Sequence, residues 1–126
     1  MTANTPATKT ILSVDDSESV RDLLHFALEA AGHRVVTAID GQDALAKCAD
    51  GPIDMVITDL NMPNIGGVEL VKKLRGMPAF RGTPIVMMIG TIQSELTPEA
   101  RRSGATDWLT KPFDLDQLWS LTSRLL

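Results

Sequence analysis

The chain has 126 residues, of which 44% are hydrophobic and 22% charged, and its formal net charge at pH 7 is -4. The apolar fraction excludes a disordered chain, and the length is sufficient for one domain that buries its own core without metal or disulfide cross-links. The acidic balance argues against direct binding to nucleic acid, which normally requires a basic face.

The sequence also restricts cross-linking and location. Cys48 is the only cysteine, so neither an intrachain disulfide nor a cysteine metal cluster can form. No segment reaches the roughly 18 consecutive apolar residues of a membrane span, and the N-terminus lacks the apolar core of a signal peptide. We therefore expect a cytoplasmic protein without membrane insertion, in which residues 1–8 form a loose or disordered tail and residues 9–126 a single domain.

Five short apolar runs predict strands, and they alternate with five segments of helical periodicity. The expected strands are residues 10–14, 34–38, 55–59, 84–89 and 106–110. The expected helices are residues 17–31, 41–50, 68–75, a short one from 98, and 115–125. Such alternation implies right-handed crossovers. The expected fold class is therefore α/β, with a doubly wound five-stranded parallel sheet and five helices.

Two of these helices carry specific expectations. In the first, apolar residues recur at the three-and-four spacing of a single buried face, and this set is Val20, Leu23, Leu24, Ala27, Leu28 and Ala31. The fourth should be about two turns long, capped by Thr97 with Pro98 in its first turn. Its Arg101–Arg102 pair is interpreted as a solvated face.

Polar side chains stand at the carboxyl ends of three of the predicted strands. Asp15 and Asp16 follow the first, Asp59 ends the third, and Lys111 follows the fifth. In open parallel sheets these ends line the ligand crevice, so we expect the four side chains to converge. Asp59 alone would be interpreted as a residue that opens a turn, and Lys111 alone as a surface lysine.

Three carboxylates in one crevice repel each other and require a counter-charge. Oxygen ligands favour Mg²⁺, which binds one or two carboxylates and pairs with phosphate oxygens; Mn²⁺ is expected to substitute for it. The crevice therefore predicts a phosphoryl ligand. A carboxylate can itself be the nucleophile of phosphoryl transfer while a cation and a lysine neutralise the developing charge, and Asp59 is our candidate nucleophile.

With these positions fixed, the chain from Lys9 to Leu126 resembles the receiver domains of two-component response regulators, most closely the single-domain CheY-like proteins of flavodoxin-like fold. The similarity rests on three motifs, which are specific at these separations: V-D-D-S at 14–17, D-L-N-M-P-N-I-G-G at 59–67 and G-A-T-D-W-L-T-K-P-F at 104–113.

The resemblance implies a role for each residue of the crevice. Asp59 would accept a phosphoryl group from a histidine kinase, and Lys111 would bind the phosphate. Mg²⁺ would be bound by Asp15, Asp16, Asp59 and the backbone carbonyl of Asn61, and the Lys111–Pro112 peptide bond would be cis. Such a domain is a phosphoacceptor that assists its own phosphorylation and dephosphorylation, not an enzyme in the usual sense. Its partner surface would be the face of the fourth helix, fifth strand and fifth helix, and chemotaxis is inferred from the missing output domain.

The chain departs from the family at the end of the fourth predicted strand. Receivers usually place Thr or Ser there, followed by a small residue, and the hydroxyl contacts the phosphoryl group and carries the switch. Here the positions are Ile89 and Gly90, with Thr91 next. Loss of one hydrogen bond to a charged group, about 1.5–3 kcal/mol, would weaken the coupling between phosphorylation and the output face. Alternatively, Ile89 only fills a β-branched strand position and other contacts hold the phosphate.

A second departure is Trp108, which occupies the position of the family's aromatic rotamer switch. An indole needs more room than a phenol ring to move inward, so we expect it to act as a partly exposed cap on the core. Pro98 should also delay the fourth helix and lengthen the loop before it.

Two other functions remain open on the sequence. One is a receiver fold that no longer switches and serves as a phosphate sink or as a phosphorylation-independent binding module, which Ile89 favours. The other is an aspartyl-phosphate hydrolase of the haloacid-dehalogenase type. That family needs a second Asp two residues after the nucleophile, where this chain has Asn61.

Overall fold

The computed structural model describes residues 8–90 and 97–126, and its centre is one parallel sheet of five strands in the order β2-β1-β3-β4-β5. The strands are β1 (Thr10–Val14), β2 (Arg34–Ala38), β3 (Met55–Asp59), β4 (Ile85–Ile89) and β5 (Asp107–Thr110). The helices are α1 (Glu18–Ala30), α2 (Gly41–Cys48), α3 (Gly67–Arg75), α4 (Pro98–Arg101) and α5 (Leu115–Leu125), with a short 3-10 helix at Pro78–Phe80. The predicted α/β class with five parallel strands and five helices is confirmed.

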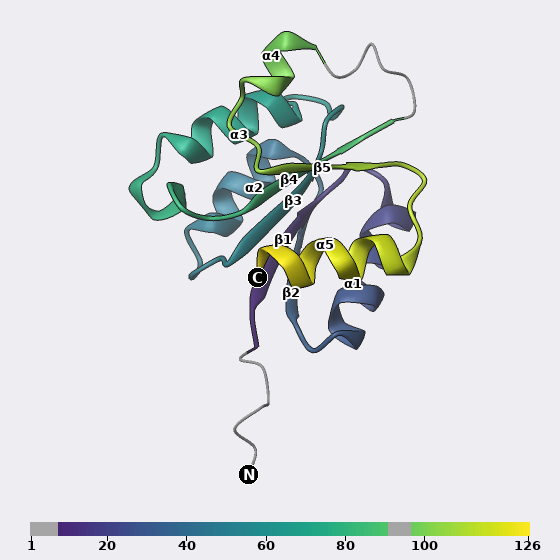
Figure 1. The fold of residues 1–126 in the computed structure, drawn as a ribbon. Coiled ribbons are helices and arrows are strands. Elements are labelled where there is room, and N and C mark those ends of the chain that lie inside the picture. Colours follow the sequence, from purple (N-terminus) through teal and green to yellow (C-terminus); the bar gives the residue numbers. More distant parts are fainter. Residues whose placement is uncertain (1–7, 91–96) are drawn as a thin grey trace.

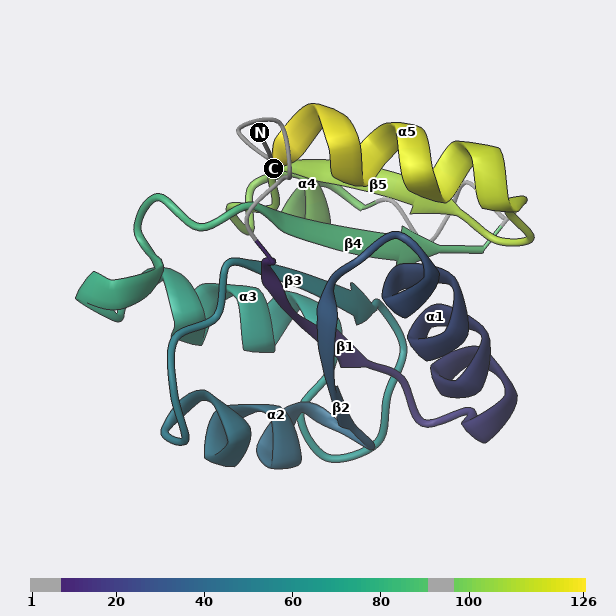
Figure 2. The same cartoon turned by 90° about the horizontal axis from the view of Figure 1, so that it is seen from below.

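Helices cover both faces of the sheet, α1 and α5 one face and α2, α3 and α4 the other (Figures 1 and 2). Side chains therefore divide into two cores. The core under α1 and α5 contains Ile11, Met55, Ile57, Val86 and Met88, and the opposite core contains Leu12, Val14, Val56, Ile85 and Met87. Burial on both faces explains why the central strands are continuous apolar runs.

Polar side chains fix where the helices begin. Ser17 is the N-cap of α1, Thr97 caps α4 through the amide of Ala100, and Asp114 caps α5 in a capping box with Gln117. These side-chain oxygens accept from backbone N–H groups that have no partner within the helix. Among the described residues, no helix is long and apolar enough to cross a membrane.

The structure corrects several sequence-based details. Leu23 is 42% exposed, and Ala31 lies beyond the end of α1 and is exposed. The helix buries only the narrow face of Leu24, Ala27 and Leu28 against the flat sheet, and Leu23 is turned about 100° away from Leu24.

Some element boundaries also differ from the prediction. The second helix ends at Cys48 rather than at residue 50, and the fourth has a single turn, Pro98–Arg101, instead of two. The apolar run of the third strand begins at Met55 as predicted, whereas β4 and β5 each begin one residue later than predicted. The predicted lengthening of the loop before α4 falls on residues 91–96, outside the described residues, as does most of the predicted N-terminal tail.

One arginine joins the chain segments that lead into β4 and β5. The Arg75 guanidinium donates to the carbonyl oxygens of Phe80, of Thr83 at 2.8 Å and of Gly104 at 3.0 Å, and to the hydroxyl of Thr106 at 3.1 Å. Gly104 has a φ of 109°, and a Cβ atom there would lie 2.9 Å from the Arg75 side chain. A glycine is therefore required both by conformation and by this close approach.

Candidate functional site

The carboxyl ends of β1, β3 and β5 bring together the charged side chains that the sequence singled out. The Lys111 ammonium donates to Oδ2 of Asp15 at 3.0 Å and lies 3.2 Å from Oδ1 of Asp59. Lys111 therefore bridges two carboxylates that come from different strands. The Lys111–Pro112 peptide bond is cis.

Asp15 is completely buried, and both its side chain and its backbone carbonyl accept hydrogen bonds. Its Oδ1 accepts from the backbone amide of Ser17 at 2.8 Å, and its backbone carbonyl accepts from the Arg21 guanidinium at 2.8 Å. Arg21 was not identified from the sequence, where it looks like one charge on an exposed helix face. These bonds hold the first turn of α1 against the end of β1.

Asp59 is the last residue of β3, and its side chain is only 13% exposed. Its Oδ1 also accepts from the backbone amide of Leu60 at 2.9 Å, and its carbonyl oxygen accepts from the buried hydroxyl of Thr58 at 3.0 Å. A Cβ atom on Gly67 would lie 2.3 Å from that carbonyl. The start of α3 can therefore approach Asp59 only because residue 67 has no side chain.

The surroundings of Asp59 and Lys111 shift the pKa of both groups. Burial raises the pKa of Asp59, the nearby charge of Asp15 raises it further, and Lys111 and the Leu60 amide oppose the shift only in part. Burial lowers the pKa of Lys111, but its hydrogen bond to Asp15 and the charges of Asp59 and Asp15 outweigh that effect, so its pKa is raised overall. The lysine is thus held as a cation.

The carboxylates also fit a metal ion. Asp15, Asp16 and Asp59 each offer an oxygen, and these oxygens all lie within 4.8 Å of one another. Asp16 is exposed whereas the other two are buried or half-buried, so the group opens to solvent on one side. A set of hard oxygen ligands with access to water suits Mg²⁺. Asn61 is exposed and lies two residues after Asp59.

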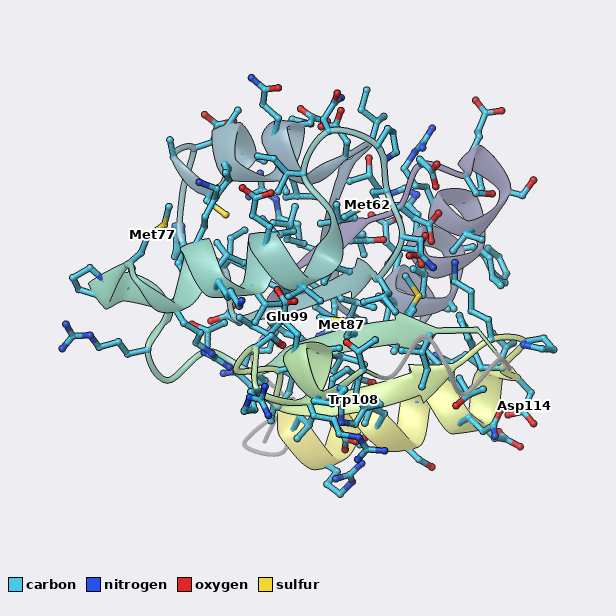
Figure 3. The ribbon with its side chains drawn as sticks, turned by 90° about the horizontal axis from the view of Figure 1, so that it is seen from above. Met62, Met77, Met87, Glu99, Trp108 and Asp114 are labelled. Atoms are coloured by element: carbon cyan, nitrogen blue, oxygen red, sulfur yellow. The ribbon has the colours of Figure 1, made fainter. Side chains whose placement is uncertain are left out.

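Two of the predicted switch positions, Ile89 and Trp108, lie on the face of the sheet covered by α2, α3 and α4. Ile89 is half-buried and packs, together with Trp108, against the core beneath α2, α3 and α4. Trp108 is paired in register with Met87, and Figure 3 shows these two side chains at neighbouring positions on β5 and β4. Gly90 ends the described stretch and Thr91 lies outside it. Trp108 is thus the partly exposed core cap expected from the sequence.

Comparison with known proteins gives the same family as the three motifs. A family model described as the response regulator receiver domain matches residues 11–123. The chain is 33% identical over 108 residues to Protein PilG of Pseudomonas aeruginosa, which covers 86% of this chain and 80% of PilG. It is 37% identical over 116 residues to the regulatory protein AtoC of Escherichia coli, of which it spans only 25%.

Solved structures agree with this assignment. The chemotaxis protein CheY4 of Vibrio cholerae is 40% identical, superposes with a TM-score of 0.89, and covers 95% of this chain and 100% of its own. The receiver domain of NtrX from Brucella abortus is 33% identical with a TM-score of 0.84, over 92% of this chain and 97% of that one. The chain therefore belongs to the response regulator receiver domain family of two-component systems.

Proposed function

We propose that Asp59 accepts a phosphoryl group from the phosphohistidine of a histidine kinase, in a Mg²⁺-dependent reaction, and that the domain signals by binding a partner protein. The observation that carries this proposal is the triangle of Asp15, Asp59 and Lys111 beside the exposed carboxylate of Asp16. A chemotaxis-type pathway is part of the proposal, supported by the similarity to CheY4. The cytoplasmic location expected from the sequence is also part of it.

The chemistry follows from the positions of the side chains. An Asp59 carboxylate oxygen attacks phosphorus, an O–P bond forms, and the P–N bond of the phosphohistidine breaks with its electron pair returning to the imidazole. Bound Mg²⁺, held by Asp15, Asp16, Asp59 and the Asn61 carbonyl, would neutralise charge on the transferring group. Lys111 already lies between Asp15 and Asp59, and it can donate to a phosphoryl oxygen on Asp59 without leaving Asp15.

Intact mass after incubation with acetyl phosphate and Mg²⁺ tests the acceptor. We expect the parent chain to gain one phosphoryl group and Asp59→Asn to gain none, since an amide is not a nucleophile toward phosphorus. A parent without added mass, or an equal gain in the variant, would contradict the assignment of Asp59.

We infer that the phosphodonor docks along α1, because this helix starts beside the crevice and exposes an apolar stripe. The stripe consists of the apolar Leu23 and Phe26, which are 42% and 69% exposed. The small side chains of Ser19 and Ala30, also exposed, continue the row, so that the four positions recur at spacings of four, three and four. This is the spacing at which one helix packs against another.

Charged residues beside the stripe indicate which kind of helix of a phosphodonor would fit α1. Asp22 and Glu29, both exposed, flank it on one side at a spacing of seven residues. A second copy of this chain packed antiparallel would set these carboxylates against the same carboxylates, which is unfavourable. A donor helix with apolar residues flanked by lysine or arginine is therefore the partner that fits α1.

We also propose that the downstream target binds the face formed by α4, β5 and α5, as the family resemblance implies. This face contains Trp108, which packs against the same core cluster as Ile89, and this shared core offers a route from the carboxyl end of β4 to the surface. The Asp107–Arg124 ion pair, 2.8 Å between Oδ2 and Nη2, links β5 to α5 within it.

A second proposed function is a phosphate sink or a binding module that does not switch, and one specific observation favours it. Ile89 places an apolar side chain, packed on the core, where receivers usually have the hydroxyl that contacts the phosphoryl group. Amide exchange of residues 85–90 and 97–112, with and without beryllofluoride and Mg²⁺, separates the two functions. Altered protection supports a switch, and an unchanged pattern supports the sink or binding module.

A further inference from the structure

Positive charge is concentrated in one part of this acidic chain. Residues 72–102 contain six of the twelve basic residues and two of the sixteen acidic ones, a formal charge of +4, so that the remainder carries -8. The six are Lys72, Lys73, Arg75, Arg81, Arg101 and Arg102. They come from the C-terminal half of α3, the loop before β4, and the end of α4.

The fold gathers these segments around Arg75. Its guanidinium bonds the carbonyl oxygens of Phe80 and Thr83, on either side of Arg81, and the carbonyl oxygen of Gly104, two residues after Arg102. It also lies 3.5 Å from the Arg81 carbonyl. The backbones that carry Arg81 and Arg102 are therefore held against a single side chain.

The two lysines of the region are already neutralised. Lys72 pairs with Glu99 of α4 at 3.0 Å and Lys73 with Glu69 at 3.8 Å, and Figure 3 shows Glu99 between α4 and α3. By contrast, Arg81, Arg101 and Arg102 are exposed, and their side chains make no ion pair or hydrogen bond with the described residues. The helix dipole explains a basic residue at the end of α4, where Arg101 lies. It does not explain Arg81, which follows the 3-10 helix.

We propose that Arg81, Arg101 and Arg102 form a docking surface, termed here the arginine surface, for a segment of another protein rich in aspartate and glutamate. An exposed guanidinium offers a planar fork that matches a carboxylate, and several clustered forks suit several neighbouring carboxylates. Nucleic acid fits less well, because the nearby Phe80 is only 5% exposed and cannot stack on bases.

The position of the arginine surface in the fold determines whether a partner bound to it would block Asp59. Arg75 bonds groups just before β4 and β5, at the amino ends of the strands, whereas Asp59 and Lys111 lie at the carboxyl ends. A partner on the arginine surface therefore leaves the crevice open, and the domain can hold that partner while Asp59 meets a phosphodonor.

Fluorescence anisotropy of the full chain with a labelled oligoglutamate peptide, and with an oligothymidine of equal charge, tests the proposal. The variant Arg81→Gln/Arg102→Gln is matched by Lys9→Gln/Arg34→Gln, since both change the net charge from -4 to -6. We expect the peptide affinity to fall at least about fivefold in the first variant, to change less than about twofold in the second, and to weaken with added salt.

Each other outcome overturns the proposal. No binding of the peptide to the parent chain would mean that the three arginines do not form a docking surface for an acidic segment, and an equal loss in both double variants would mean that only overall charge matters. Tighter binding of oligothymidine through the same arginines would replace the protein segment by a nucleic acid. Equal acetyl phosphate uptake and equal circular dichroism in all three chains establish that folding and the crevice are intact.

Discussion

At the scale of single residues, Asp59, the proposed acceptor, carries a charge that opposes folding. Its carboxylate is desolvated and lies near Asp15, and Lys111 compensates only partly, so its pKa is raised. A group with a raised folded-state pKa supports folding most in acid, and this support is lost as the pH rises through the folded-state value. At neutral pH the charged Asp59 therefore opposes folding.

Replacing this charge should stabilise the metal-free domain. We predict that Asp59→Asn raises the free energy of unfolding at neutral pH in the presence of a chelator, and that the gain vanishes as the pH falls to the ordinary aspartate value of 3.8. Urea unfolding of both chains across this pH range measures the difference. A gain that is constant with pH would exclude the titration of Asp59 as its cause.

Ser13 provides a second residue-scale prediction. It is completely buried, and among the described residues its hydroxyl has no hydrogen-bond partner. A buried unsatisfied polar group costs about 1–3 kcal/mol, so Ser13→Ala should increase the free energy of unfolding by roughly 1 kcal/mol. The buried hydroxyl of Thr122 donates to the Trp119 carbonyl, and Thr122→Val as the control should destabilise instead.

At the scale of elements, α1 has one buried face and one exposed apolar stripe. Its Leu24, Ala27 and Leu28 pack on the sheet, while the stripe with Leu23 and Phe26 faces outward. In addition, Trp119 of α5 donates to the carbonyl of Ala27 at 2.9 Å, which holds α1 in place. The outward stripe is therefore presented on a fixed helix rather than on a loop.

This arrangement predicts a selective effect of Phe26→Asp. Transfer from any purified histidine kinase that phosphorylates the parent chain should slow by about tenfold or more, because an aromatic anchor is lost and a charge is added. Phosphorylation by acetyl phosphate should be unchanged, since the crevice is intact. Equal slowing with both donors would show that the substitution acts on the crevice and not on docking.

On the opposite side of the sheet, Arg75 at the end of α3 holds separate chain segments together, as the Trp119 hydrogen bond does for α1. Its guanidinium bonds the segments before β4 and β5, and Arg75→Ala leaves several of these acceptors without a partner. We predict a loss of about 2–3 kcal/mol in the free energy of unfolding, measured by urea denaturation. Arg81→Ala, at an exposed neighbouring arginine, should change it by less than about 0.5 kcal/mol.

For the whole molecule, a Mg²⁺ ion bound by the cluster of Asp15, Asp16 and Asp59 would couple metal binding to stability. A ligand that binds only the folded state stabilises it by about 2.7 kcal/mol at a hundred times its dissociation constant. We therefore expect MgCl₂, at matched ionic strength with KCl, to raise the thermal midpoint of the parent chain. Asp16→Asn should remove most of this increase without a comparable loss of stability in KCl alone, because Asp16 is exposed. An equal response of the two chains to MgCl₂ would exclude Asp16 as a ligand.

The sequence by itself determined the order of strands and helices, because burial on two faces produces continuous apolar strands and because glycine, proline and capping residues end each element. It also located the crevice, since parallel strands must bring Asp15, Asp59 and Lys111 to the same edge of the sheet. The three receiver motifs added the family.

Only the tertiary structure decided which side chains are exposed and which distant groups meet. Leu23 belongs to the apolar pattern of α1 but lies outside the contact with the sheet. Arg75 looks like an ordinary helix-end arginine, yet it joins segments up to 31 residues away. Its hydrogen bonds hold the backbone segments that carry Arg81 and Arg102. Periodicity reports local geometry along one element, whereas such contacts depend on how separate elements pack, and no local pattern encodes that.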